Sequence, residues 1–176
     1  MCYLLFRAFS LHSAVKSPPR ENILPACEGC GTRTNEAHIA RRAERMELAS
    51  RFRPGRIRVL LLDGAPPSRA EDYFYLAASN RADRALGARR YFDELMNCAS
   101  ISTGADSKET TQLGEFQQKG FFLTYAVECP FEEQDDPKAA LRRLAPTVLK
   151  RVQSVYDPAY VVPSRSRRQS SSAYLA

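Results

Sequence analysis

Two cysteines separated by two residues are the first feature of this sequence that could do chemistry. Cys27 and Cys30 lie in the segment CEGCG, whose glycines allow the backbone to fold back so that both thiolates reach one metal ion. One such pair supplies half of a four-ligand site. Cys98, Cys129 and His38 are the candidates for the other half, and the sequence does not give their distances from the pair. The segment therefore predicts metal or cluster binding, with an inert pair of thiols as the alternative.

An apolar run followed by turn residues is the second feature. Residues 57–67 read IRVLLLDGAPP, so the apolar stretch stops abruptly at Asp63 and Gly64. A continuous run of Val, Ile and Leu is typical of a strand that is buried on both faces. Such strands belong to parallel α/β sheets, which bind ligands just beyond their carboxyl ends. We therefore expect a site at residues 63–67, with an ordinary turn after a core strand as the alternative.

Alternating helix and strand patterns in the rest of the chain would position these two features. Asn35 can cap a helix, which Pro54 and Gly55 would end. Asp136 followed by a proline is a second helix start. We predict helices over residues 35–52, 84–97 and 136–156, strands over 57–62, 121–127 and 159–162, and a loop over 101–115. This order implies right-handed crossovers and an α/β fold with a short, mainly parallel sheet.

The two ends of the chain differ in composition from the middle. Residues 1–22 begin with an apolar stretch that Arg7 interrupts and contain no convincing signal-peptide cleavage site, so we expect a poorly ordered leader. Residues 164–176 form a Ser/Arg tail that cannot bury enough surface to become ordered. The folded domain is therefore expected at residues 23–163. No apolar run is long enough to cross a bilayer, so we expect no membrane partner. We also expect the protein to be cytoplasmic and monomeric.

The charge balance favours an anionic partner. Lys and Arg number 26 against 20 Asp and Glu, which gives a net charge of +6. A basic protein suits nucleic acid, so DNA is the expected partner. Six arginines gather in and after the first predicted helix, where they would contact phosphates or, alternatively, form an ordinary solvated helix face. They are Arg41, Arg42, Arg45, Arg51, Arg53 and Arg56.

Three segments, in this order, resemble motifs of the iron–sulfur uracil-DNA glycosylases. Residues 27–34 (CEGCGTRT) are similar to the family's opening C-x-x-C with its downstream Thr-Arg-Thr. Residues 58–67 (RVLLLDGAPP) resemble its first strand and the Gly-Glu-Ala-Pro-Gly loop, and residues 122–130 (FLTYAVECP) resemble its strand ending in a cysteine. The resemblance covers residues 27–163. It implies a three-layer α/β sandwich that flips a uracil out of DNA and hydrolyses its N-glycosidic bond.

The resemblance also implies which residues form the site. Asp63 would be the catalytic residue, in the loop that positions or activates water. The substrate-binding residues would be Gly64, Ala65, Pro66, Tyr125 and, as the ring that stacks on the base, Phe74. The ligands of an iron–sulfur cluster, with zinc as the alternative, would include Cys27, Cys30 and Cys129.

This chain departs from the glycosylase pattern at several positions. The family's loop glutamate and pocket asparagine are replaced by Gly64 and Tyr125, and its fourth cluster cysteine by Leu141. The closing His-Pro-Ser motif is absent, which predicts a divergent and C-terminally truncated member. Three functions therefore stay open: a glycosylase-like DNA-binding protein with or without base excision, a non-catalytic zinc- and nucleic-acid-binding or adaptor module, and a structural remnant without a ligand.

Overall fold

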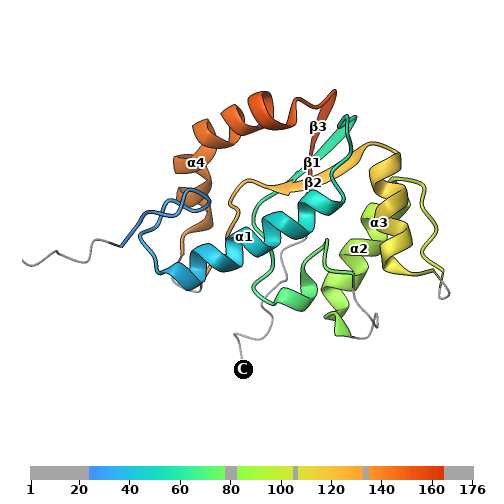
Figure 1. Ribbon diagram of the computed structural model, residues 1–176, viewed down its shortest axis with the longest axis horizontal. Coiled ribbons are helices and arrows are strands. Elements are labelled where there is room, and N and C mark those ends of the chain that lie inside the picture. Colours follow the sequence, from blue (N-terminus) through green and yellow to red (C-terminus); the bar gives the residue numbers. More distant parts are fainter. Residues whose placement is uncertain (1–23, 78–82, 105–106, 133–134, 165–176) are drawn as a thin grey trace, which may run out of the picture.

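Three parallel strands and the helices between them form the part of the chain that the computed structural model describes, residues 24–77, 83–104, 107–132 and 135–164 (Figure 1). The elements are α1 (Glu36–Arg51), β1 (Val59–Asp63), the 3-10 turn η1 (Ala70–Asp72), α2 (Leu86–Cys98), α3 (Glu109–Gln118), β2 (Phe121–Tyr125), α4 (Pro137–Arg151), the π-helical turn η3 (Val152–Tyr156) and β3 (Tyr160–Pro163). The expected leader, and the expected tail apart from Ser164, lie outside the described residues. None of the described helices has the length and apolar composition needed to cross a membrane.

The sheet has the strand order β2-β1-β3, and β1 pairs in parallel with both neighbours. Leu60 of β1 lies opposite Phe122 on one side and Val161 on the other. Leu60 is fully buried, as expected of a central strand covered on both faces. The predicted α/β class and the parallel sheet are therefore confirmed.

Helices cover both faces of this sheet. Successive strand residues point to opposite faces of the sheet, so Phe121 and Phe122 pack against different layers. Phe122 contacts the ring of Tyr156 in η3, with centroids 5.6 Å apart, on the face that α4 covers. Phe121 contacts Phe116 of α3 at 5.3 Å on the opposite face. The sheet thus forms the middle of the three layers that the glycosylase resemblance implied.

The outer edge of β2 is closed by a side chain. The Tyr75 hydroxyl donates a hydrogen bond to the Leu123 carbonyl (3.0 Å) and accepts one from the Leu123 N–H (2.7 Å). Burial raises the pKa of Tyr75 well above its usual value, so the hydroxyl keeps its proton. Phe52, which follows α1, stacks on this ring at 6.1 Å. Tyr75 therefore does what a neighbouring strand would do for one residue of the edge.

Tyr75→Phe is expected to destabilise the fold by about 1–3 kcal/mol, because it leaves the N–H and carbonyl of buried Leu123 without their partner. The free energy of unfolding in urea measures this loss. Tyr160→Phe is the matched control. Tyr160 is 70% exposed, so water can satisfy any group that bonded to its hydroxyl. Equal stability of the Tyr75→Phe variant and the original chain would contradict the edge-closing role.

The loop predicted over residues 101–115 is wrong, because α3 begins inside it at Glu109. Glu109, Gln112, Leu113 and Phe116 are all buried, and their spacing places them on one face of a helix. Two of these four residues are polar. The inward face therefore did not stand out as an apolar stripe in the sequence.

Glu109 is buried because Arg84 pairs with it. The two side chains are each 1% exposed, and they form a salt bridge with 2.9 Å between Arg84 Nη2 and Glu109 Oε2. The same guanidinium donates to the carbonyls of Tyr73 (2.9 Å) and Leu76 (2.6 Å). One arginine therefore fixes α3 and the aromatic segment after η1 to each other.

Candidate metal centre

Three cysteines and one histidine converge at one end of the molecule. The ligand atoms of Cys27, Cys30, His38 and Cys129 all lie within 4.8 Å of one another. The Sγ atoms of Cys27 and Cys129 are 3.6 Å apart, and His38 Nε2 lies 3.5 Å from the Sγ of Cys30 and 3.0 Å from that of Cys129. Tetrahedral ligands of one zinc ion would be about 3.8 Å apart for two sulfurs and about 3.6 Å for sulfur and nitrogen. The group therefore fits four ligands around a single metal ion.

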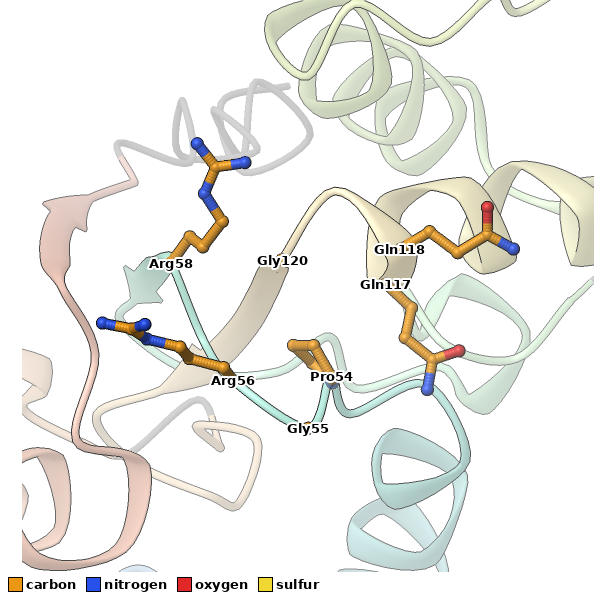
Figure 2. Close-up of a pocket in the computed structure, with 7 residues that line it drawn as sticks. All are labelled: Pro54, Gly55, Arg56, Arg58, Gln117, Gln118 and Gly120. Atoms are coloured by element: carbon orange, nitrogen blue, oxygen red, sulfur yellow. The ribbon is translucent and has the colours of Figure 1, made fainter.

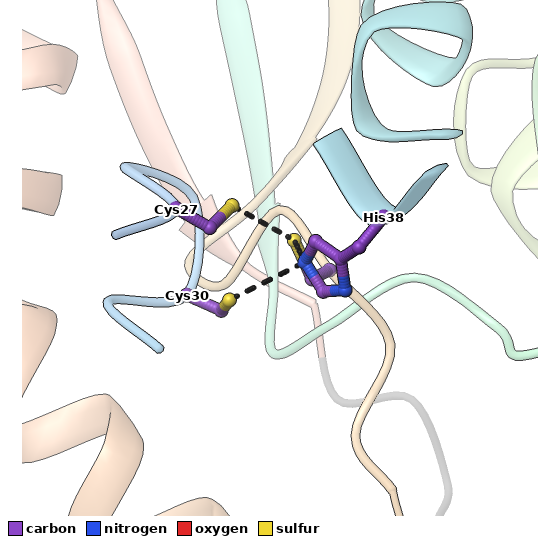
Figure 3. A group of neighbouring side chains, drawn as sticks. Cys27, Cys30 and His38 are labelled. Atoms are coloured by element: carbon purple, nitrogen blue, oxygen red, sulfur yellow. Dashed lines mark hydrogen bonds between the residues drawn. The ribbon is translucent and has the colours of Figure 1, made fainter. Parts of the chain in front are cut away.

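A tight turn presents the first two cysteines. Residues 26–33, which we name the cysteine knuckle, are closed by an antiparallel bridge between Ala26 and Arg33. Gly31 has a φ of 73°, in the left-handed region that glycine adopts without strain, and its N–H donates to the Cys27 carbonyl. The knuckle thereby turns both thiols toward His38 at the start of α1 (Figure 3).

The other two ligands come from distant parts of the chain. His38 lies in the first turn of α1, where its N–H donates to the side chain of the N-cap Asn35 (3.0 Å). Cys129 follows β2 and is held beside the knuckle, because the N–H of Glu128 donates to the Gly29 carbonyl at 3.0 Å. A metal ion at this position would join the knuckle, α1 and β2.

The electrostatics of the cluster favour a bound cation. Burial and the neighbouring thiols raise the pKa of Cys129 well above its ordinary value. Burial also acts to raise the pKa of Cys27, but hydrogen bonds from the knuckle backbone and from the thiols of Cys129 and Cys30 outweigh it and lower the pKa overall. Burial and the charges of Arg41 and Arg45 lower the pKa of His38, which leaves the imidazole neutral, as a metal ligand must be. A divalent ion would supply the positive charge that three adjacent thiolates require.

The structure brings together the three cysteines that the sequence singled out. His38, one of the candidates for the remaining position, completes the group. Cys98 is exposed at the end of α2 and lies outside it. The signal for His38 was its place in the first turn of a capped helix that begins six residues after Cys30.

A cavity of about 360 Å³ adjoins the metal centre, between α1 and α4, with β2 as its floor. Its lining includes four arginines and two glutamates, which leaves two net positive charges: Arg42, Arg45, Arg53, Arg151, Glu28 and Glu128. It also includes four aromatic rings, those of Tyr73, Phe122, Tyr125 and Tyr156. We name this cavity the arginine pocket.

Glu128 connects the arginine pocket to the metal centre. Its carboxylate accepts hydrogen bonds from Arg42 (2.8 and 2.5 Å) and from Arg151 (2.6 Å), and it directly precedes the ligand Cys129. A Cβ on Gly29 of the knuckle would lie 2.5 Å from Arg42 Nε, so only glycine leaves room for this arginine. Metal ligation and the wall of the pocket therefore depend on the same short segments.

Comparison of the chain with protein-family models, with curated proteins and with solved structures found no match. The resemblance to the iron–sulfur glycosylases therefore stays a hypothesis based on three short motifs. The contacts of the residues that it implies as a catalytic site are the remaining evidence on that site.

Asp63, the expected catalytic residue, is the last residue of β1 and is 5% exposed. Its Oδ1 accepts from the Gly64 N–H and its Oδ2 from the Tyr91 hydroxyl, both at 2.7 Å. Burial and the charge of Asp63 raise the pKa of Tyr91 far above its ordinary value, which keeps the phenol protonated as the donor. Tyr91 also shares a hydrogen bond with Ser164 (2.9 Å). Both carboxylate oxygens of Asp63 are thus engaged by the protein itself.

The expected substrate-binding residues do not form one site. Pro66 and Tyr125 line the arginine pocket. Phe74 is 2% exposed, with its ring packed against Phe92 (5.3 Å) and Phe116 (5.4 Å) in the core. Asp63, Gly64, Ala65 and Phe74 are not among the described residues that line that pocket. Of the residues 63–66, the structure thus places Pro66 at the pocket and the other three outside its described lining.

Proposed function

We propose that this chain is a zinc-stabilised, non-catalytic module that binds nucleic acid. The observation that carries the proposal is the Cys27/Cys30/His38/Cys129 group, which fastens the start of an arginine-rich segment to the rest of the domain. Three cysteines and one histidine are a common ligand set of structural zinc sites, and four protein ligands leave no open position for a catalytic water.

The spacing of the ligands is the reason for proposing zinc instead of an iron–sulfur cluster. All four ligand atoms lie within 4.8 Å of one another, as ligands that share one ion must. The thiolates of a cubane cluster bind separate irons and radiate outward from its corners, so they stand farther apart. The donor set and the spacing together therefore favour a single ion.

The distribution of arginine supports nucleic acid as the partner. Residues 41–58 contain seven arginines and two glutamates, which is five of the six net positive charges of the chain. This segment, which we name the basic segment, lines the arginine pocket near its start and a second, open depression at its end (Figure 2). In that depression Arg56 and Arg58 lie on one side, and Gln117 and Gln118 on the other. Guanidinium and amide groups spread over such a length suit a phosphate backbone.

The contacts of the expected catalytic residues support a non-catalytic role. A base-excising enzyme needs a carboxylate that can reach water and a ring that can stack on the extruded base. The Asp63 carboxylate is already bonded to Gly64 and Tyr91, and Phe74 is a core residue. Neither side chain is poised for those tasks.

Fluorescence anisotropy with a short labelled DNA single strand tests the proposal. The Arg56→Gln/Arg58→Gln double variant is expected to bind about tenfold more weakly and to lower the salt-dependence slope by about 1–2, since two phosphate contacts are lost. A Lys138→Gln/Lys150→Gln variant, which removes the same charge from α4, is the matched control. Absence of binding at low salt would contradict the proposal. Release of uracil that is lost in Asp63→Asn would overturn its non-catalytic part.

A further inference from the structure

We infer that the arginine pocket binds a nucleoside monophosphate, either free or as the 5′-phosphorylated end of a strand. The inference rests on the proposed function, which supplies nucleic acid as the class of partner. It adds that the pocket recognises a single nucleotide with a terminal phosphate. The pocket volume of about 360 Å³ is near the lower end of the range for small-molecule sites, so it suits one nucleotide. An internal stretch of nucleic acid would not fit in it.

Two unpartnered donors are the main evidence. Arg45 Nε and Arg151 Nε are buried and have no hydrogen-bond partner among the described residues, and both arginines line the pocket. Buried polar groups are nearly always hydrogen-bonded, so the two arginines keep hydrogen-bonding capacity that the described residues do not use. A phosphate group offers several oxygens, and guanidinium groups match its geometry well.

The hydrogen bonds of Arg151 fix its guanidinium at the pocket wall. Its Nη1 donates to Glu128 (2.6 Å) and its Nη2 to the Tyr125 carbonyl (2.5 Å), so the guanidinium cannot leave its place at the pocket wall without breaking both bonds. Glu128 in turn is shared with Arg42. One member of the pair is therefore preorganised before any ligand arrives.

The net charge of the lining favours a terminal phosphate. Four arginines against two glutamates leave two positive charges, which match the two negative charges of a phosphomonoester. A phosphodiester inside a strand carries one. The pocket therefore fits the end of a strand, or a free nucleotide, better than the middle of one.

Aromatic rings line the remainder of the pocket. Tyr73 and Tyr125 contact each other at 6.0 Å, and Phe122 contacts Tyr156 at 5.6 Å. The Arg53 guanidinium lies 5.4 Å from the centre of the Tyr156 ring. Rings and a stacked guanidinium are the surfaces on which bases pack in proteins that bind single strands. The same cavity thus offers contacts to both parts of a nucleotide.

The open depression in Figure 2 lacks these features. Arg56 and Arg58 are exposed there, and Gln117 Nε2 already donates to the Arg53 carbonyl at 2.9 Å. In the picture, the two arginines and the two glutamines extend in different directions. The depression suits transient contacts with a phosphate backbone, whereas the arginine pocket suits a stably bound ligand.

Isothermal titration calorimetry with thymidine monophosphate and with thymidine tests the inference. Thymidine monophosphate is expected to bind, and thymidine to bind about tenfold more weakly or not at all. Arg45→Gln and Arg45→Lys are both expected to weaken binding of the nucleotide about tenfold, because each loses the guanidinium group that lines the pocket. Arg41→Gln is the matched control, since Arg41 is exposed on the same helix and does not line the pocket. Thermal melts of all variants establish that each remains folded.

Anisotropy with 5′-phosphorylated and 5′-hydroxyl strands identifies the source of the nucleotide. Tighter binding of the phosphorylated strand, lost in Arg45→Gln, supports a strand end, while binding of thymidine monophosphate alone supports a free nucleotide and removes the proposed nucleic-acid function. Equal binding of both strands without binding of thymidine monophosphate overturns the inference and leaves the proposed function intact. Equal affinity of Arg45→Gln and Arg41→Gln for the nucleotide also overturns it.

Discussion

Cys129→Ser is expected to lose the bound metal and, with it, the stable fold. Cys129 is fully buried, and a metal ion held by it would join β2 to the cysteine knuckle and α1. Structural zinc in small peptides binds with an apparent free energy of about 10–16 kcal/mol at neutral pH. The total stability of an ordinary domain is about 5–15 kcal/mol. Loss of one ligand therefore removes a contribution comparable to the whole stability.

Elemental analysis and thermal melts measure this effect. The purified chain is expected to contain one zinc ion, and a chelator such as EDTA is expected to lower its melting temperature as the Cys129→Ser substitution does. Cys98→Ser is the control, because Cys98 is an exposed cysteine outside the metal centre, and it should change neither zinc content nor melting. Iron with visible absorption would favour the cluster of the glycosylases. A metal-free chain with an unchanged melting temperature would refute the structural role of the metal.

Arg84→Met is expected to cost about 3–5 kcal/mol of stability, because it breaks an ion pair whose two side chains are each 1% exposed. The substitution also removes the donors to the carbonyls of Tyr73 and Leu76, so the segment before α2 loses its tie to α3. Methionine keeps much of the volume of the arginine stem, so the loss reports mainly on charge and hydrogen bonding.

The free energy of unfolding in urea measures the stability that Arg84→Met loses. Two further variants test whether the loss comes from the buried ion pair. Arg51→Met is the control: Arg51 is 61% exposed and its Nη2 lies 2.7 Å from Oε1 of the exposed Glu47, and such surface pairs contribute little. The Arg84→Met/Glu109→Leu double variant is expected to recover part of the loss, since it replaces both members of the buried pair with apolar side chains. An Arg84→Met variant as stable as the original chain would show that the buried pair does not hold α3 in place.

Signals that act over a few residues were enough to predict much of the fold. Asn35 accepts from the His38 N–H at the start of α1, and Asp136 accepts from the Lys138 and Ala139 N–H groups at the start of α4. The apolar run became the central strand for the same reason: its composition allows no exposed face. Caps and continuous apolar runs constrain the backbone locally, so they can be recognised without the partner elements.

Features that depend on distant residues could not be predicted in this way. The Nε2 of His38 and the Sγ of Cys129 are 3.0 Å apart, yet the two residues are separated by 91 positions, and no spacing rule relates them. The side of α1 that faces the arginine pocket could not be predicted either, because Arg42 and Arg45 line that pocket beside Met46 and Ala49. A helix beside a polar cavity does not carry the apolar stripe that helix prediction uses.

The closed edge of the sheet limits how copies of this chain could associate. Tyr75 occupies the outer edge of β2, while β3 is the opposite edge of the described sheet, with Val161 and Val162 45% and 44% exposed. Filaments grow by strand addition only when a sheet offers two free edges, because each subunit must both receive a strand and present one. Chains that joined through β3 would therefore stop at a symmetric pair. Tyr75 thus blocks the pairing of an added strand at Leu123, and Tyr75→Phe would remove that block as well as weaken the fold.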